Sequence, residues 1–277
     1  MAVDEYYSSL RHYVRLLCED QDSHSLVVNS EPGVGKSYQI TEELKRSCEG
    51  VYKAVEGYLT PMNLVEALHQ TKGEDDVLFL DDVSGIVGDE KGLNVLKSAT
   101  WTVDEEKGRL ITWGSTTAKL EVETPFRFRG SVVMCFNSVP ENAHFEAVKS
   151  RSLYYELDLS RDQKLDIMRE IAEKPKSGTT KGERLDVVGW LSSILTAAHK
   201  VNLRQYEHAI RLYRYAKGKD VDWRELFLDS LSADEDLKKA RRCLDRSETV
   251  EEASSLFERK TGKSRSTFFR YKRQLEQ

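Results

Sequence analysis

One eight-residue segment, residues 30–37 (SEPGVGKS), constrains the fold more than any other part of the chain. It follows a short apolar run at residues 25–29 (SLVVN), which predicts a buried strand, and it leads into a helical stretch that ends near Cys48. A glycine-containing loop at this junction lets main-chain N–H groups and the positive end of the helix dipole surround an anion. The segment therefore predicts an α/β core with a phosphate site where the strand ends.

The residue types in this segment match the needs of a bound nucleotide. Lys36 is expected to reach the β- and γ-phosphates, and the Ser37 hydroxyl is expected to hold Mg²⁺. Ser30 stands where this motif usually has glycine, so a residue with a side chain must fit the turn. A chance glycine-rich turn is the alternative, and the flanking strand and helix disfavour it. The candidate nucleotide-binding residues are Gly33, Val34, Gly35, Lys36, Ser37 and Tyr38.

A second motif, residues 77–82 (VLFLDD), predicts a central strand that ends in two acids. The ligand crevice of an open α/β sheet lies at the carboxyl ends of its strands. We expect Asp81 to hold Mg²⁺ together with Ser37, and Asp82 to polarise an attacking water. Asp82 is one methylene shorter than the more common glutamate, so the water must lie closer or hydrolysis must be slow. Two solvated acids at a strand end would be the interpretation without residues 30–37.

Three further polar residues are candidates for the same site. Asn137 ends the predicted strand at residues 131–136, where its amide can orient the attacking water, although asparagine is also ordinary turn chemistry. Arg151 is a candidate for stabilising transition-state charge on a neighbouring subunit's nucleotide, and a surface ion pair is the alternative. Arg204 lies in the first turn of a predicted helix, where a cation opposes the helix dipole and thus invites a functional explanation.

In their order along the chain, these motifs resemble those of the AAA+ ATPase superfamily. Residues 30–37 resemble its Walker A motif, and residues 77–82 resemble Walker B. Asn137 is similar to sensor 1, Arg151 to the arginine finger and Arg204 to sensor 2. Several stretches also resemble ATP-binding proteins of phages and other mobile elements: DDVSGI, LKSATW, FRFRGSVVMCFN and AVKSRS.

The resemblance extends over about residues 20–220 and implies an architecture. It implies an αβα P-loop core with a parallel sheet at residues 1–160, in which residues 1–24 form an N-terminal helix, and a helical lid at 161–233. The implied cofactors are ATP and Mg²⁺. The implied assembly is a homo-oligomeric ring, commonly a hexamer, with ATP between subunits.

A predicted hairpin lies between the Walker B-like and sensor 1-like strands. Two alternating runs, residues 110–113 (LITW) and 120–123 (LEVE), flank the turn segment GSTTAK. AAA+ members with a hairpin at this place use it to touch DNA in the ring pore, so Lys119 near the tip is a candidate DNA contact. Arg127 and Arg129 alternate with phenylalanines and share one strand face. These two arginines either contact a neighbouring subunit or a phosphate, or they lie on a strand face that is exposed to solvent.

The C-terminal segment is basic, whereas the rest of the chain is acidic. Residues 236–277 carry 12 Lys/Arg and 7 Asp/Glu, a net charge of +5, which leaves −10 for the other 235 residues. Three helical pieces at about 234–245, 248–260 and 265–276 predict a helix-turn-helix domain at 234–277. A lid extension or an oligomerisation helix is the alternative to DNA binding. The candidate DNA-binding residues of this tail are Lys263, Arg265, Arg270, Lys272 and Arg273.

Composition bounds the remaining possibilities. With 39% hydrophobic and 32% charged residues, the chain fits a soluble globular protein. No apolar run is long enough to cross a bilayer, and the N-terminus lacks a signal-peptide core. The four scattered cysteines predict neither a disulfide framework nor a zinc site, so we expect a reducing compartment, the cytoplasm or, for a viral protein, the host cytoplasm.

These features predict an ATPase that remodels DNA as a helicase, a helicase loader or a replication initiator, with a possible protein partner such as a replication factor. A regulatory ATP switch that recruits partners, as AAA+ transposition regulators do, is one alternative. A protein remodeller whose tail binds a protein is another.

Overall fold

The computed structural model describes most of the chain and divides it into two compact units. The first unit consists of Met1–Lys174 and Trp190–Arg204, and the second of Pro175–Gly189 and Gln205–Gln277. The described residues are 2–20, 24–101, 108–114, 120–139, 142–195, 201–231, 235–247 and 249–275.

Five parallel strands form the sheet of the first unit, in the spatial order β2-β3-β6-β1-β7. The central strands are apolar and are buried on both faces, as in parallel sheets covered by helices on each side. The strands predicted at residues 25–29, 77–82 and 131–136 are therefore confirmed. The bounds of the five strands are β1 (Ser25–Ser30), β2 (Tyr52–Tyr58), β3 (Val77–Ser84), β6 (Ser131–Phe136) and β7 (Leu153–Leu157).

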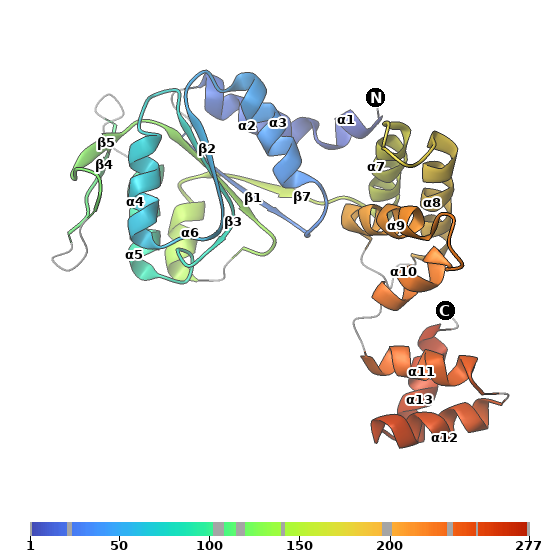
Figure 1. Cartoon of the computed structure of the whole chain (residues 1–277). Helices are drawn as coiled ribbons and strands as arrows, with labels where there is room; N and C mark the ends of the chain where they lie inside the picture. The colour runs from blue at the N-terminus through green and yellow to red at the C-terminus, as the bar shows by residue number, and fades with distance from the viewer. Residues whose placement is uncertain are drawn as a thin grey trace. The chain divides into compact units, whose positions relative to one another are not determined.

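Helices cover both faces of this sheet, which confirms the αβα architecture (Figure 1). The short helix α1 (Ala2–Tyr6) leads into α2 (Ser8–Glu19), which packs with α3 (Lys36–Ser47) on one face. On the other face, α4 (Pro61–Gln70) begins with proline in its first turn and is capped by the side chain of Thr60. The remaining helices of that face are α5 (Glu90–Thr100) and α6 (Ala143–Lys149).

A two-stranded antiparallel ribbon precedes β6 in the chain. Its strands are β4 (Arg109–Ile111) and β5 (Phe126–Phe128), so the expected pairing of 110–113 with 120–123 is wrong. Residues 120–123 form no strand. Both phenylalanines of β5 are buried in the core, whereas the apolar side chains of 120–123 are only half-buried. Pairing through β5 therefore buries two aromatic rings, which carry more apolar area than leucine and valine.

The basic residues expected in this region lie in different surroundings. Lys119, the candidate DNA contact, lies outside the described residues. Arg127 and Arg129 are both exposed, as expected for one solvent-facing side of the ribbon. Nη1 of Arg127 donates to the carbonyl of Gly108 at 2.9 Å, and Nη1 of Arg129 lies 4.0 Å from a carboxylate oxygen of Glu74.

After β7, every regular element of the described chain is a helix, as predicted. The first, α7 (Arg161–Glu173), starts with a capping box between Ser160 and Gln163. None of the helices in the described ranges has the length and apolar character needed to span a bilayer. The other bounds are α8 (Lys181–Ile194), α9 (Leu203–Ala216), α10 (Trp223–Leu231), α11 (Glu235–Asp245), α12 (Val250–Thr261) and α13 (Arg265–Leu275).

The last three helices share a small core of their own. Phe257 of α12 packs against Phe268 and Tyr271 of α13, with ring centroids 5.5 and 6.0 Å apart. Gly262 ends α12 in the left-handed region at φ +68°, so that three residues suffice to turn the chain into α13. The turn and the order of helices match the layout predicted for this segment.

Candidate functional site

The loop between β1 and α3 has the geometry of an anion cradle. Gly33 and Gly35 adopt φ values of +75° and +85°, in the left-handed region that favours glycine. A Cβ at Gly33 would lie 3.1 Å from Cβ of Asn202, and one at Gly35 would lie 3.1 Å from Oη of Tyr7. The backbone conformation thus favours glycine at both positions, and a Cβ at either one would make a tight contact.

The departure from the usual motif at Ser30 is accommodated by the backbone. Ser30 is the last residue of β1 and is buried, and its φ is not in the left-handed region. Its hydroxyl donates a hydrogen bond to the carbonyl of Glu31 at 3.0 Å. The backbone conformation at this position is therefore compatible with residues other than glycine.

Three of the predicted site residues form one hydrogen-bonded chain. The ammonium of Lys36, a residue only 5% exposed, donates to Oδ1 of Asn137 at 2.5 Å. The amide nitrogen of Asn137 in turn donates to Oδ2 of Asp82 at 2.6 Å. The structure thus brings together the loop lysine, the residue after β6 and the second acid of β3.

Asp82 is held in an unusual backbone conformation. Its φ of +50° lies in the left-handed region, the only such value for a non-glycine residue in the described part of the chain. The register between β2 and β3 shifts here, because Glu56 faces Asp81 whereas Tyr58 faces Ser84. Such a bulge redirects a side chain, and a strained residue that persists is often a functional one.

Cys135 is buried on β6 beside the first acid of β3. Asp81 is the register partner of Cys135 and is half-buried. Burial raises the pKa of the Cys135 thiol, the charge of Lys36 opposes this effect, and Asp81 adds to it. Cys135 is therefore a residue of this site that the sequence motifs did not reveal, because its position depends on the pairing of β3 with β6.

The site offers few ligands for a divalent ion. Within the described ranges, no three or more His, Cys, Asp or Glu side chains cluster as a metal site. The half-buried Asp81 carboxylate and the Ser37 hydroxyl in the first turn of α3 are the available oxygen ligands. This set fits Mg²⁺, which usually binds one or two carboxylates and takes its other ligands from phosphates and water.

The other predicted site residues lie in separate places. Arg204 is exposed in the first turn of α9, next to Leu203, whose N–H donates to the carbonyl of Gly33 at 2.8 Å. Arg151 is exposed between α6 and β7, and its main-chain carbonyl accepts from the hydroxyl of Ser25 at 3.3 Å. Tyr38 is 62% exposed on α3. None of these three side chains belongs to the chain of hydrogen bonds around Asn137.

Two contacts to the loop were missed from the sequence. The hydroxyl of Tyr7 donates to the carbonyl of Val34 at 2.7 Å, and this contact is buried. The ammonium of Lys164, on α7, donates to a carboxylate oxygen of Glu31 at 2.5 Å. Neither partner is close in sequence to the loop, and neither belongs to a motif, so no local pattern could have revealed them.

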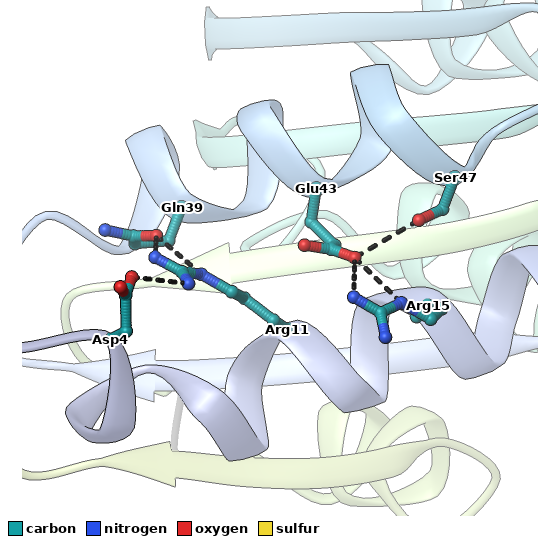
Figure 2. A network of polar contacts seen from close by, with 6 residues as sticks. All are labelled: Asp4, Arg11, Arg15, Gln39, Glu43 and Ser47. Atoms are coloured by element: carbon teal, nitrogen blue, oxygen red, sulfur yellow. Dashed lines mark hydrogen bonds and ion pairs between the residues drawn. The ribbon is translucent and has the colours of Figure 1, made fainter. Parts of the chain in front are cut away.

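Polar contacts also fix α3 on α2 (Figure 2). Arg11 donates twice to the side-chain oxygen of Gln39, at 3.0 and 2.7 Å. Arg15 donates twice to one oxygen of the buried Glu43 carboxylate, at 3.0 and 2.7 Å. The hydroxyl of Ser47 reaches the same oxygen at 3.1 Å. The helix whose start forms the anion cradle is thus held from its side.

The basic residues of the tail differ in how they are partnered. Lys263 donates to the carboxylate of Asp236, and Arg265 pairs with Glu251 at 3.3 Å. The three others lie on α13. Arg270 and Arg273 are exposed and Lys272 is half-exposed.

Comparison with known proteins gave one curated relative and several solved structures, while no family model matches the chain. An uncharacterised 36.7 kDa protein from the nrdC–mobD intergenic region of Enterobacteria phage T4 is 26% identical over 200 residues. That match covers 65% of this chain and 60% of the phage protein, so the chain spans less than two thirds of its relative.

Solved structures of Thermotoga maritima RuvB are among the matches. The Holliday junction branch migration motor is 14% identical, with a TM-score of 0.47, and the match covers 94% of this chain and 83% of that one. A point mutant of the same protein is 13% identical, with a TM-score of 0.48 and coverage of 96% and 83%. The five-stranded parallel sheet and the glycine-containing loop between β1 and α3 agree with the αβα P-loop fold expected from the sequence.

Proposed function

We propose that the protein binds Mg²⁺-ATP at residues 33–37 and hydrolyses it. The observation that carries this proposal is the hydrogen-bonded chain from Lys36 through Asn137 to Asp82, which starts from a loop whose backbone conformation favours glycine at positions 33 and 35. A loop with these features binds phosphate through its N–H groups. The acid at the other end of the chain, Asp82, would act on a water near that phosphate.

Each residue has a distinct part in the proposed chemistry. Lys36 would leave Asn137 for the terminal phosphates, which frees the amide oxygen to orient a water. Asp82 would accept the proton of that water. Bound Mg²⁺, held by Ser37 and Asp81, would neutralise charge on the phosphates.

The proposal includes a ring of identical chains. Arg151 is exposed and lies outside the hydrogen-bonded chain formed by Lys36 and Asn137, as a residue acting on a neighbouring subunit's nucleotide would be. Arg204 would act within its own chain, because the residue before it is bonded to the loop at Gly33. Replacing Arg151 by alanine should therefore abolish hydrolysis and retain ATP binding, and normal hydrolysis by that variant would refute the assignment.

We further propose that ATP turnover is coupled to DNA, as in a helicase, a helicase loader or a replication initiator. The three-helix arrangement of α11–α13 and the exposed cations of α13 support this part of the proposal. Arg270 and Arg273 are the most accessible phosphate contacts, because the salt bridges of Lys263 and Arg265 would first have to open. Lys119 remains a proposed contact on the loop between β4 and β5.

A regulatory ATP switch is a second candidate. The specific observation in its favour is the short side chain of Asp82, whose carboxylate is already bound by Asn137 at 2.6 Å. A carboxylate held in this way must give up a hydrogen bond before it acts on water, so turnover would be slow. Slow hydrolysis without strand displacement would favour this function over a motor.

The test is the rate of ATP hydrolysis with no DNA, with single-stranded DNA and with double-stranded DNA. We expect DNA to raise the rate for the natural chain, Lys36→Ala to abolish it, and a paired Arg270→Ala, Arg273→Ala variant to keep the basal rate but lose the stimulation. Removing two phosphate contacts should also lower the salt dependence of DNA binding, by a slope of about two. Replacing Arg211 and Arg214 by alanine provides a matched loss of two exposed arginines that are three residues apart on a helix. Stimulation unaffected by the α13 pair would point to a tail that binds a protein.

A further inference from the structure

Two consecutive carbonyl groups of the phosphate loop are bound from outside the loop. The Gly33 carbonyl accepts the N–H of Leu203 at 2.8 Å, and the Val34 carbonyl accepts the hydroxyl of Tyr7 at 2.7 Å. The two donors come from opposite ends of the first unit's sequence, one from the start of α9 and the other from the junction of α1 and α2. They meet at adjacent peptide groups of a single turn.

Because each of these carbonyl groups shares a planar peptide with the next N–H group, a bond that fixes the carbonyl also fixes the direction of that N–H. A trans peptide is planar, and its C=O and N–H point in opposite directions. Both peptide groups are trans. When Leu203 holds the Gly33 carbonyl, the N–H of Val34 must point away from α9. When Tyr7 holds the Val34 carbonyl, the N–H of Gly35 must point away from Tyr7, toward the cradle.

The Tyr7 contact leaves little freedom. Tyr7 is 1% exposed, and its hydroxyl lies 3.1 Å from the place that a Cβ on Gly35 would occupy. Burial raises the pKa of this hydroxyl, so it remains a neutral donor. A rotation of the Val34–Gly35 peptide would leave both the hydroxyl and the carbonyl without a partner in a buried place, which is costly.

Further contacts between α2 and α3 hold the N-terminal segment, and Tyr7 with it, against the loop. Tyr7, Arg11 and Arg15 are spaced four residues apart and therefore share one helix face. Arg11 and Arg15 reach Gln39 and Glu43 of α3. The same face of the N-terminal segment thus contacts both the phosphate loop and the helix that follows it.

We propose that Tyr7 is a positioning residue for the nucleotide's phosphate groups: together with the N–H of Leu203, it orients the Val34 and Gly35 amides toward the bound phosphate. This inference rests on the proposed nucleotide binding at residues 33–37 and adds to it a requirement for two contacts outside the motif. Tyr7 acts through the loop and does not itself touch the nucleotide.

The test compares Tyr7→Phe with Tyr6→Phe, and Leu203→Pro with Leu203→Ala. Each tyrosine variant removes one hydroxyl, but that of Tyr6 donates to Asp166 and not to the loop. Proline is favourable in the first turn of a helix, so Leu203→Pro removes the N–H with little harm to α9, and Leu203→Ala reproduces the loss of the leucine side chain. The affinity for Mg²⁺-ADP is measured by calorimetry, and the thermal midpoint is measured without nucleotide.

We expect Tyr7→Phe to weaken ADP binding about tenfold, equivalent to about 1.4 kcal/mol, because the Gly35 N–H is no longer oriented before the phosphate binds. Tyr6→Phe should bind as the natural chain does. Leu203→Pro should bind about tenfold more weakly than Leu203→Ala. Tyr7→Phe should also lower the midpoint without nucleotide, because the buried carbonyl of Val34 loses its partner, so affinities are compared at a temperature at which all the variants are folded.

The outcomes separate this inference from the function on which it rests. If the natural chain binds ADP and both Tyr7→Phe and Leu203→Pro bind as their controls do, the positioning role is refuted and the nucleotide site stands. The positioning role is likewise refuted if affinity falls only in proportion to a loss of folded protein. If the natural chain binds ADP no better than Lys36→Ala, the nucleotide site and the positioning role both fail.

Discussion

Replacing Asp82 by glycine and by alanine separates the strain at this residue from its chemistry. Both substitutions remove the carboxylate and its hydrogen bond with Asn137, so any difference between them reflects the backbone. At the φ of +50° the residue occupies the left-handed region, which glycine adopts freely and alanine does not. The pair therefore tests whether the protein holds a strained acid at the end of β3.

The magnitude follows from the conformation. In ordinary backbone, glycine is less stable than alanine by about 0.5–1 kcal/mol. In the left-handed region the order reverses, because a residue with a Cβ incurs a strain of about 1–2 kcal/mol there. We expect Asp82→Gly to be more stable than Asp82→Ala by about 1 kcal/mol, which corresponds to about 2–4 °C in the thermal midpoint of a unit of this size.

Thermal unfolding without nucleotide measures this difference, and an ATPase assay on the same proteins measures the chemistry. Both variants should lose hydrolysis by about 10²–10⁴-fold while binding ATP, since a general base is gone and the loop is intact. Asp82→Asn is the control, because asparagine tolerates the left-handed region and keeps an acceptor for Asn137. Alanine equal to or more stable than glycine would refute the strain. Undiminished hydrolysis would refute the role of Asp82.

Two further predictions concern stability. Arg109 is buried, donates to the carbonyls of Ala99 and Gly130 at 2.7 and 2.5 Å, and has a pKa lowered by burial to about 10. We expect Arg109→Lys to lower the urea midpoint at neutral pH more than Arg109→Met, because an ammonium is harder to bury and cannot bridge both carbonyls; the reverse order would contradict this reasoning. Hydrogen bonds from Lys217 and then from the main chain lower the pKa of Glu183 to about 2. The stabilisation of the folded state by ionised Glu183 should be complete above the unfolded-state pKa of about 4.5 and should be lost as the pH falls toward 2. The thermal midpoint of the second unit should therefore fall less steeply with acid in Glu183→Gln than in the natural chain. An equally steep fall in both proteins would contradict the role of Glu183.

Much of the core and of the candidate site follows from local sequence. Each central strand is an apolar run bounded by turn residues, and such runs are buried because helices cover both faces of a parallel sheet. The ends of parallel strands lie at one edge, so the meeting of Lys36, Asn137 and Asp82 could be anticipated: the first two follow β1 and β6, and Asp82 lies near the end of β3. The glycines at 33 and 35 were likewise identifiable, since the turn needs left-handed backbone.

The features that escaped prediction depend on distant parts of the chain. Residues 120–123 alternate as a strand does, but β5 pairs with β4 because its phenylalanines bury more apolar surface. The bulge at Asp82 arises from the pairing of β3 with β2, which no short pattern encodes. Tyr7 lies 27 residues before its partner Val34, in a segment whose sequence predicts only an amphipathic helix.

The central claim is that residues 33–37 cradle the phosphates of a nucleotide. Calorimetric titration of the natural chain with Mg²⁺ and a non-hydrolysable ATP analogue tests it most directly, with Lys36→Ala as the partner variant. We expect one site per chain and a loss of affinity of at least about tenfold in Lys36→Ala, because charge-assisted hydrogen bonds to phosphate are lost. Equal binding by the two proteins, or no heat from either, would contradict the account.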